Sequence, residues 1–170
     1  MLTKKAKYAF KALIALARNE EKHPMLISDI AEKEQLPKKF LEAILLELKR
    51  SGYLGSKKGA GGGYYLLKQA SEIKMSSIIR VIDGPIALLP CVSLNFYERC
   101  EECTETYCGI RDVMKDVRDA TLKILGETSI ADMVARENTL APRLQNQDVP
   151  TVSTNNQPLE SNGKSDIVDL

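Results

Sequence analysis

The chain has 170 residues, of which 44% are hydrophobic and 5% aromatic, and its 24 Lys and Arg nearly balance its 23 Asp and Glu. This size and composition suit one compact domain with appendages rather than two large cores. No unbroken apolar run approaches the length needed to cross a bilayer, and the N-terminus leads into an amphipathic segment rather than the apolar core of a signal peptide. We therefore expect a cytoplasmic protein with no membrane segment.

The net charge of +1 conceals two halves of opposite charge. Residues 1–90 carry 16 Lys and Arg against 9 Asp and Glu, whereas residues 91–170 carry 8 against 14. Lys and Arg bind nucleic acids by displacing the counterions condensed on phosphates. The basic half is therefore expected to contact double-stranded DNA, and the acidic half to face away from it.

Two amphipathic helices are predicted at the start of the chain. Apolar residues recur at helical spacing over residues 3–18, and Thr3 is placed to cap this helix. A second, short helix is expected to open at residues 26–28, with Ser28 as its N-cap, and to end near Gln35.

A third helix follows closely, and with the second it predicts a helix-turn-helix. Pro37 suits a first helical turn, and Gly52 is a C-terminal stop. Its apolar stripe is formed by Phe40, Leu41, Ile44, Leu45 and Leu48. The second helix of such a unit enters the major groove of DNA. The expected groove-side residues are Lys38, Lys39, Glu42 and the adjacent Ala43.

A β-wing is predicted immediately after the helix-turn-helix. Residues 53–58 and 64–67 read as strands, and the glycine-rich run 59–63 between them permits a tight turn and close approach to a sugar-phosphate edge. Lys57 and Lys58 supply positive charge at the tip. The predicted DNA-binding residues are Lys4, Lys5, Lys38, Lys39, Glu42, Lys57, Lys58, Gly61 and Gly62, with Lys7 adding to the basic surface.

Each of these polar residues also has a simpler interpretation. Runs of lysine commonly mark a solvated face, although their position on a helix-turn-helix and wing favours DNA binding. Glu42 either accepts a hydrogen bond from a cytosine amino group or pairs with a lysine of its own helix. His23 is the only histidine, and it is assigned no role.

The remaining helices lie on either side of a cysteine-rich segment. A helix capped by Ser71 is expected over residues 71–82, ending at the breaker sequence 83–85. Apolar residues keep a helical register over residues 110–125, and this long helix has too little core to pack on within one chain. It is therefore expected to pair with a second copy in a homodimer.

A short closing helix over residues 130–137, capped by Ser129, is expected to precede a disordered tail. The fold class is mainly α, with a small β-wing. The expected domains are a winged helix-turn-helix DNA-binding domain over residues 1–84, a cysteine-rich sensor loop over 85–109, a dimerisation helix and closing helix over 110–138, and the tail over 139–170.

All four cysteines of the chain, Cys91, Cys100, Cys103 and Cys108, fall within 18 residues. Such crowding in a reducing compartment predicts thiolates that converge on a metal, an iron-sulfur centre or one another. An iron-sulfur cluster matches the ligand demand of three or four thiolates, and its two-iron or four-iron type stays open.

Structural zinc is the first alternative, because the pair Cys100 and Cys103 has the spacing of half a zinc knuckle. A thiol switch through a disulfide of the same pair is the second, although the acidic residues around it would raise the thiol pKa and slow the reaction. Four unconnected thiols in a solvent loop remain the simplest interpretation.

Several segments together resemble the Rrf2 family of bacterial transcriptional regulators. They are Leu2-Thr3 with Tyr8-Ala9, Ile30-Ala31, Phe40-Leu41-Glu42, the run from Gly59 to Tyr64, and the cysteine loop followed by a long helix. The resemblance covers residues 1–137 in the order that the family uses. It implies a homodimer that reads operator DNA with two winged helix-turn-helix units, and it assigns base reading to Lys39, Glu42 and Lys58.

The resemblance also implies cluster ligands, with two departures. Cys91, Cys100 and Cys108 correspond to the three cysteines that hold a cluster in several members. A histidine ligand of one subgroup is replaced here by Arg111, and an aspartate ligand of another by Lys7. Cys103 is the obvious replacement as fourth ligand.

These features predict a DNA-binding repressor, not an enzyme, whose cluster senses redox state, nitric oxide or iron-sulfur status. Losing or oxidising the cluster would reorder the loop and move the two DNA-binding units off their half-site spacing. A regulator that senses through a partner or small molecule is an alternative. A thiol-disulfide oxidoreductase is less favoured, because the Cys100 and Cys103 pair lacks the strand-then-helix setting of such enzymes.

Overall fold

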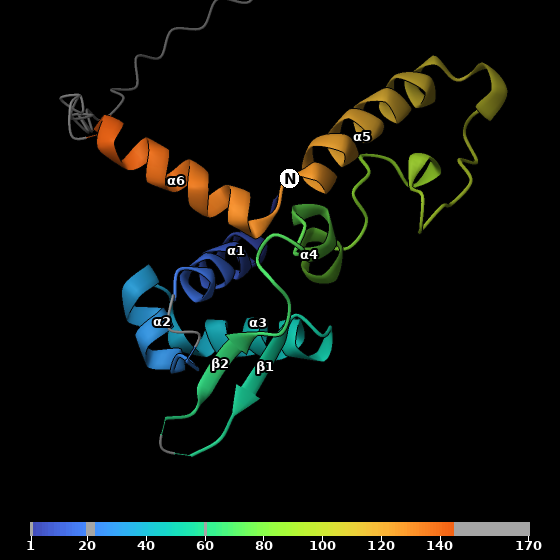
Figure 1. The fold of residues 1–170 in the computed structure, drawn as a ribbon. Helices are drawn as coiled ribbons and strands as arrows, with labels where there is room; N and C mark the ends of the chain where they lie inside the picture. The colour runs from blue at the N-terminus through green and yellow to red at the C-terminus, as the bar shows by residue number, and fades with distance from the viewer. Residues whose placement is uncertain (1, 20–22, 60, 145–170) are drawn as a thin grey trace, which may run out of the picture.

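The computed structural model of the chain describes residues 2–19, 23–59 and 61–144 (Figure 1). It is mainly helical with a small antiparallel sheet, as predicted. The elements are α1 (Lys4–Ala17), α2 (Ile27–Glu34), α3 (Lys38–Arg50), β1 (Leu54–Lys57), β2 (Gly63–Leu66), α4 (Met75–Ile82), the 3₁₀ turns η1 (Pro90–Val92) and η2 (Glu105–Tyr107), α5 (Gly109–Glu127) and α6 (Ile130–Leu144). Among the described residues, no helix is both long and apolar enough to span a membrane.

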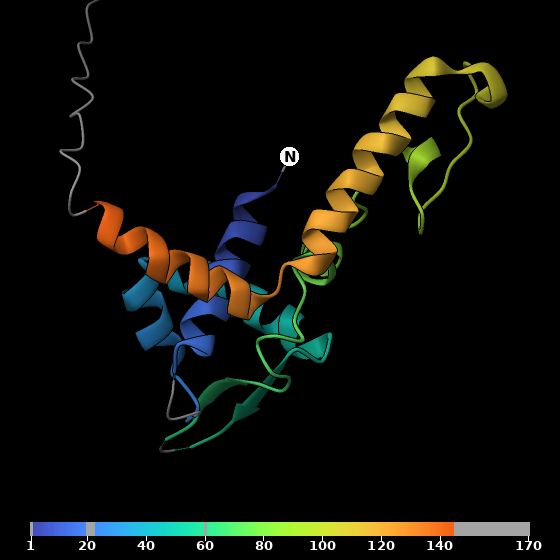
Figure 2. The same ribbon diagram turned by 45° about the horizontal axis from the view of Figure 1, so that its top comes forward.

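Helix α1 is the centre of the core. It contacts α2, α3, α4 and α6, and α6 crosses it in both views (Figures 1 and 2). Its buried residues are Ala6, Ala9, Phe10, Ala12, Leu13, Ile14, Ala15 and Leu16. The four alanines let neighbouring helices approach closely, while the larger side chains fill the spaces between them. We call the unit formed by α1 to α4, β1, β2 and α6 the head.

The predicted cap of α1 is confirmed and has a second use. Thr3 Oγ1 accepts a hydrogen bond from the Ala6 N–H at 3.1 Å, and the Thr3 N–H donates to Asp83 Oδ2 at 3.1 Å. Because Asp83 is the C-cap of α4, the same residue that starts α1 also fastens it to the end of α4.

Helix α2 begins two residues earlier than its predicted cap, Ser28, would place it. Leu26 occupies the N-cap position without a side-chain hydrogen bond, and the Ser28 hydroxyl bonds to Asp29 instead, so the prediction for Ser28 was wrong. The reason lies outside the helix: Met25 exchanges backbone hydrogen bonds with Tyr64, which holds the chain extended up to the helix start. The end is confirmed, since Gln35 adopts the left-handed conformation at φ +53°.

Helix α3 buries most of its predicted stripe, namely Leu41, Ile44, Leu45 and Leu48. Phe40 departs from the prediction, because it is 46% exposed. Its ring meets Tyr8 of α1 edge-on with 5.7 Å between centroids, so it covers the outer edge of the α1 and α3 contact rather than filling the core.

The wing is an antiparallel pair whose register runs from Leu54 opposite Leu66 to Lys57 opposite Gly63. Gly63 has φ +143°, and a Cβ on it would collide with the backbone of Met25. The residue must therefore be glycine for β2 to bridge Met25 on its other edge while pairing with β1. This bridge anchors the base of the wing to the segment before α2.

Helix α4 starts at Met75 instead of Ser71, and its N-cap is Lys74, so both the predicted start and the predicted cap were wrong. Residues 73 and 74 are extended because this segment pairs with the one between α5 and α6. The Ile130 N–H donates to the Ile73 carbonyl at 2.9 Å, and the Met75 N–H donates to the Thr128 carbonyl at 2.9 Å. A helix through these residues would forfeit both bonds.

The long helix α5 projects away from the head (Figures 1 and 2) and has no buried residue.

Helix α6 instead returns to the head, with Ile130 fully buried in the core. Ser129 caps it as predicted, since its hydroxyl accepts from the Asp132 N–H while Asp132 accepts from the Ser129 N–H. Because α6 reaches Leu144, it is longer than predicted and includes the first residues of the expected tail. The tail from 145 onward lies outside the described residues.

The wing anchor yields a stability prediction. Gly63→Ala should lower the free energy of unfolding by about 3 kcal/mol or more, because it combines an unfavourable φ with a backbone collision. Gly61→Ala is the matched control: its φ of +73° is also left-handed, but a Cβ there meets nothing within 4 Å, so about 1 kcal/mol is expected. Urea denaturation followed by circular dichroism measures both, and equal losses would contradict the Met25 bridge.

Candidate DNA-binding face and cysteine loop

The outward face of α3 carries the predicted groove-side residues. Lys38, Lys39, Glu42 and Ala43 are all exposed, and they lie opposite the buried stripe that holds α3 against the head. The first turn of α3 therefore presents two lysines, with Glu42 one turn further along. This is the arrangement expected of a helix that enters the major groove with its N-terminal turns.

One exposed residue of this face was missing from the predicted set. Leu46 is 42% exposed and lies four residues after Glu42 and seven after Lys39, on the same stripe of the helix. That spacing was visible in the sequence, but Leu46 was not singled out there. An exposed apolar side chain among polar ones is suited to contact a thymine methyl group.

The wing tip presents Lys57 and Lys58 as exposed side chains. The two predicted glycines differ in their roles. Gly61 is exposed, whereas Gly62 is buried within the turn and donates its N–H to the Gly59 carbonyl at 2.9 Å. Gly62 therefore shapes the turn, and Gly61 is the glycine free to approach a sugar-phosphate edge.

A side-chain contact links the two DNA-facing elements. Lys49 Nζ, near the end of α3, donates to Ser56 Oγ of β1 at 2.7 Å. Neither residue was singled out from the sequence, because the contact depends on how the wing folds back beside the helix. It helps to fix the wing relative to α3.

The lysines of α1 divide into free and paired side chains. Lys4 and Lys7 are exposed, but Lys5 is half-buried and pairs with Glu47 of α3 at 2.6 Å. Lys11 donates to the Glu34 carbonyl of α2 at 3.1 Å. The paired lysines therefore hold α1 against the helix-turn-helix, and Lys5 has less charge available for phosphate than the sequence indicated.

The structure brings together three of the four cysteines. Cys103 is hydrogen-bonded to the thiols of Cys100 and Cys108, and these interactions raise the pKa of Cys103 to about 12. Cys108 is the N-cap of α5, and its Sγ accepts from the Arg111 N–H at 3.4 Å. That backbone bond, together with the Cys103 thiol, lowers the pKa of Cys108. A thiolate is thus favoured at the helix N-terminus.

Cys91 lies apart from this group. It is buried in η1, which packs against α5 some way from η2 and the helix start (Figures 1 and 2). The Val92 carbonyl beside it accepts from Arg118 Nη1 at 2.5 Å. Arg118 is ten residues beyond Cys108, which corresponds to about 15 Å along the helix. Among the described residues, no three Cys, His, Asp or Glu side chains are arranged to hold a metal ion.

Glu105 organises the polar surroundings of the three clustered thiols. It accepts from the Tyr97 hydroxyl at 2.6 Å and pairs with Arg111 Nη2 at 3.5 Å. The Tyr97 hydrogen bond is the main cause that lowers the pKa of Glu105, with smaller contributions from Arg111 and the Cys100 backbone. Glu105 therefore stays ionised and ties the loop to the first turn of α5.

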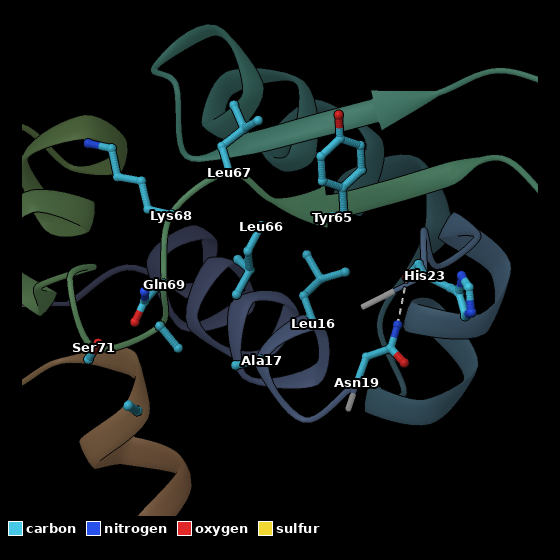
Figure 3. A pocket seen from close by; sticks show the side chains of 12 residues that line it. Leu16, Ala17, Asn19, His23, Tyr65, Leu66, Leu67, Lys68, Gln69 and Ser71 are labelled. Atoms are coloured by element: carbon cyan, nitrogen blue, oxygen red, sulfur yellow. Dashed lines mark hydrogen bonds between the residues drawn. The ribbon is translucent and has the colours of Figure 1, made fainter. Parts of the chain in front are cut away.

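A cavity of about 590 Å³ lies away from both predicted sites, between the end of α1, β2 and the start of α6 (Figure 3). Leu16 and Leu66 contribute apolar surface to it, and Asn19 Nδ2 donates a hydrogen bond to the His23 carbonyl at 2.7 Å. It shares no residue with the predicted DNA-binding or cysteine sets, and His23 has no role in either.

A family model described as "Iron-dependent Transcriptional regulator" and named Rrf2 matches residues 2–136. The chain belongs to the Rrf2 family. An Rrf2-like HTH-type regulator of Rhodobacter capsulatus is 41% identical over 149 residues, covering 85% of this chain and 99% of that protein. The regulator IscR of Escherichia coli is 29% identical over 153 residues, covering 86% and 94%.

Solved structures agree with this assignment. The cysteine regulator CymR of B. subtilis superposes with a TM-score of 0.67 at 27% identity, covering 80% of this chain and 97% of that one. IscR of T. potens gives a TM-score of 0.63 at 25% identity, covering 81% and 88%. This Rrf2 protein is thus a DNA-binding, winged-helix transcriptional regulator, as the resemblance implied.

The α3 and wing assignment predicts how lysine variants of this Rrf2 protein bind DNA. Lys39→Ala and Lys58→Ala should each weaken binding and reduce the slope of log affinity against log salt by about 1, because each removes one phosphate-neutralising charge. Glu42→Ala should change base preference more than affinity. Fluorescence anisotropy with a duplex that the wild type selects from a random pool measures all three.

Lys123→Ala, which removes an exposed lysine from α5, is the control and should change neither affinity nor salt slope. Unchanged affinity in both Lys39→Ala and Lys58→Ala would show that α3 and the wing do not face DNA.

Proposed function

We propose that this protein is a homodimeric, cytoplasmic repressor that binds operator DNA through α3 and the wing of both heads, and that an iron-sulfur cluster in its cysteine loop senses redox state, nitric oxide or iron-sulfur status. The observation that carries the proposal is the convergence of three thiols at the free end of an exposed helix. Cys100, Cys103 and Cys108 gather where α5 begins, and α5 leads directly back to the DNA-binding head.

The thiols at the start of α5, and the positive charge beside them, favour a bound group that is held by cysteines. The N-terminus of α5 and the Arg111 charge both favour negative charge at Cys108. An iron-sulfur cluster requires thiolates and is itself tuned by nearby hydrogen bonds and charge. Cys91, Cys100, Cys103 and Cys108 would hold it, with Cys91 as the ligand that must move. When bound, the cluster would supply a redox-active centre that gives up electrons to oxidants and reacts with nitric oxide.

The position of Cys91 links ligand binding to α5. The segment η1 is held on the middle of α5 by the hydrogen bond from Arg118 to the Val92 carbonyl. For Cys91 to reach the other three thiols, η1 must leave that position and move toward the start of α5. Filling or emptying the site would therefore change the surface that α5 offers to a second subunit, and with it the spacing of the two heads.

The apolar face of α5 supports dimerisation. Ile110, Val113, Val117 and Ile124 are between 39% and 69% exposed. A groove of about 470 Å³ between α4, residues 85–88 and α5 continues this surface. A contiguous apolar face on a helix that projects into solvent indicates a protein interface, and a second α5 offers the same face by two-fold symmetry.

A thiol switch is the second candidate, favoured by the hydrogen bonds of Cys103 to two neighbouring thiols. A thiol-disulfide oxidoreductase is disfavoured, because a pKa of about 12 keeps Cys103 protonated and a poor nucleophile at neutral pH. Structural zinc would need the loop to rearrange, since four thiolates must meet around one small ion.

Protein purified without oxygen should contain iron and sulfide and show visible charge-transfer absorption. The absorption should fade in air or nitric oxide, with a parallel change in operator affinity. Cys91→Ser, Cys100→Ser and Cys108→Ser should each abolish the colour, and Cys103→Ser should destabilise the cluster. Thr106→Ala, an exposed position of the same loop, is the control and should keep it.

Two results would each replace this assignment. Colourless protein with stoichiometric zinc would indicate a structural metal site. Metal-free protein with a reversible Cys100 to Cys103 disulfide would indicate the thiol switch.

Val117→Asp should prevent dimer formation, because it places an unpaired charge within the apolar seam at a cost of several kcal/mol. Lys123→Asp, an exposed position of α5 outside the apolar stripe, should leave the dimer intact. Sedimentation velocity at micromolar concentration measures both. A monomeric wild type would remove the mechanism based on two half-sites.

A further inference from the structure

The outward side of α3 has an apolar centre. The exposed residues along it are Lys39, Ala43, Leu46 and Arg50, and Leu46 is 42% exposed. From the helical pitch, Lys39 and Arg50 lie about 170° around the helix from the middle of the buried stripe. Ala43 and Leu46 lie about 150° from it, one on each side. An apolar pair between two cations is therefore the part of α3 that points most directly away from the core.

Contacts within the chain bound this strip along both edges. On one edge, Glu47 pairs with Lys5 of α1 at 2.6 Å. On the other edge, Lys49 Nζ donates to Ser56 Oγ of the wing at 2.7 Å. The head therefore covers the buried stripe of α3 and holds its two edges, and the strip that carries Leu46 faces outward between them.

The charges around the strip favour a polyanion as its occupant. Lys39 and Arg50 stand at its two ends, about 16 Å apart along the helix axis. Because the major groove is about 12 Å wide, cations at this separation can reach phosphates on both of its walls while Leu46 faces the base edges. The exposed lysines of the wing tip, Lys57 and Lys58, add positive charge beside α3.

The base edges in the major groove present one apolar group, which is the C5-methyl of thymine. A leucine side chain has no hydrogen-bond donor or acceptor. Packed against the amino or carbonyl group of another base, it would leave that group without a partner. Packed against a methyl group, it removes apolar surface of both partners from water. A leucine at the centre of the strip therefore favours thymine over the other bases.

We propose that Leu46, with Ala43 beside it, is a specificity-determining residue that reads the thymine methyl group, so that each operator half-site carries thymine where the third turn of α3 meets the groove. The inference rests on the proposed placement of α3 in the major groove and adds a base that the half-site must contain. The polar ends of Lys39 and Glu42 cannot make this contact.

Deoxyuridine tests the inference, because it differs from thymidine only in lacking the methyl group. In a duplex that the wild type selects from a random pool, each thymine is replaced singly by deoxyuridine, and affinity is measured by fluorescence anisotropy. The wild type should lose about fourfold in affinity at one or two positions of the half-site, as expected for one buried methyl group. Leu46→Ala should bind the thymine and deoxyuridine duplexes equally at those positions.

Two further variants serve as controls for the leucine contact. Leu46→Met keeps a long apolar side chain and should keep most of the discrimination. Leu140→Ala, which truncates a leucine of α6 that is 52% exposed, should keep all of it. Alanine is favourable at an exposed helix position, so Leu46→Ala should fold like the wild type, which circular dichroism checks.

The other outcomes separate this inference from the proposed placement of α3. A wild type that is insensitive to deoxyuridine at every thymine, or a Leu46→Ala variant that keeps the same loss, overturns the role of Leu46 while the lysine contacts stand. A Leu46→Ala variant that changes sedimentation but not discrimination overturns it as well, because it would assign Leu46 to a protein contact. If Lys39→Ala and Lys58→Ala both leave affinity unchanged, the placement and the inference fall together.

Discussion

The burial of most of α1 is the constraint on which the rest of the structure depends. A helix with eight buried residues, half of them alanine, must be covered by neighbours on every face except the exposed one that carries Lys4, Lys7 and Lys11. One side of that cover is the helix-turn-helix, held by the Lys5 to Glu47 and Lys11 to Glu34 contacts, and another is α6. The same packing thus orients α3 for DNA and returns the chain from α5 to the head.

The pairing of residues 73–75 with residues 128–130 fixes the C-terminal end of α5 to the head. Backbone bonds at Ile73 and Met75 fix the point where α5 ends, and Lys74 Nζ adds a bond to the Glu127 carbonyl at 3.1 Å. From this C-terminal end, the 19 residues of α5 extend about 28 Å to the clustered thiols at its N-terminus. A change at the far end therefore acts on the head through one helix, whose apolar stripe is largely exposed among the described residues.

In the cysteine loop, the pKa values of two neighbouring thiols are shifted in opposite directions. The N-terminus of α5 and Arg111 favour a thiolate at Cys108, whereas the neighbouring thiols of Cys100 and Cys108 raise the pKa of Cys103 to about 12 and keep it protonated. Cys91 is buried in η1 against α5, and in the proposed function its recruitment to the other thiols would couple a bound group to the helix.

Much of this protein could be read from the sequence, because many signals are local. The Thr3 and Ser129 caps, the left-handed Gln35, the glycine turn of the wing and the exposed lysines of α3 depend on residues within one or two turns of each other. These predictions were confirmed, as was the mainly helical winged fold. The clustering of Cys100, Cys103 and Cys108 also follows from their closeness in the chain.

Contacts between distant segments decided the rest. Ser28 and Ser71 have good capping chemistry, but the backbone bonds of Met25 to Tyr64 and of residues 73–75 to residues 128–130 keep those segments extended. Phe40 meets the Tyr8 ring of another helix at the surface instead of filling the core, and Cys91 is buried in η1 beside the Val92 carbonyl that Arg118 binds. Sequence alone determined which local structures were available, and tertiary hydrogen bonds and packing selected among them, because a buried backbone group must find its partner wherever the fold provides one.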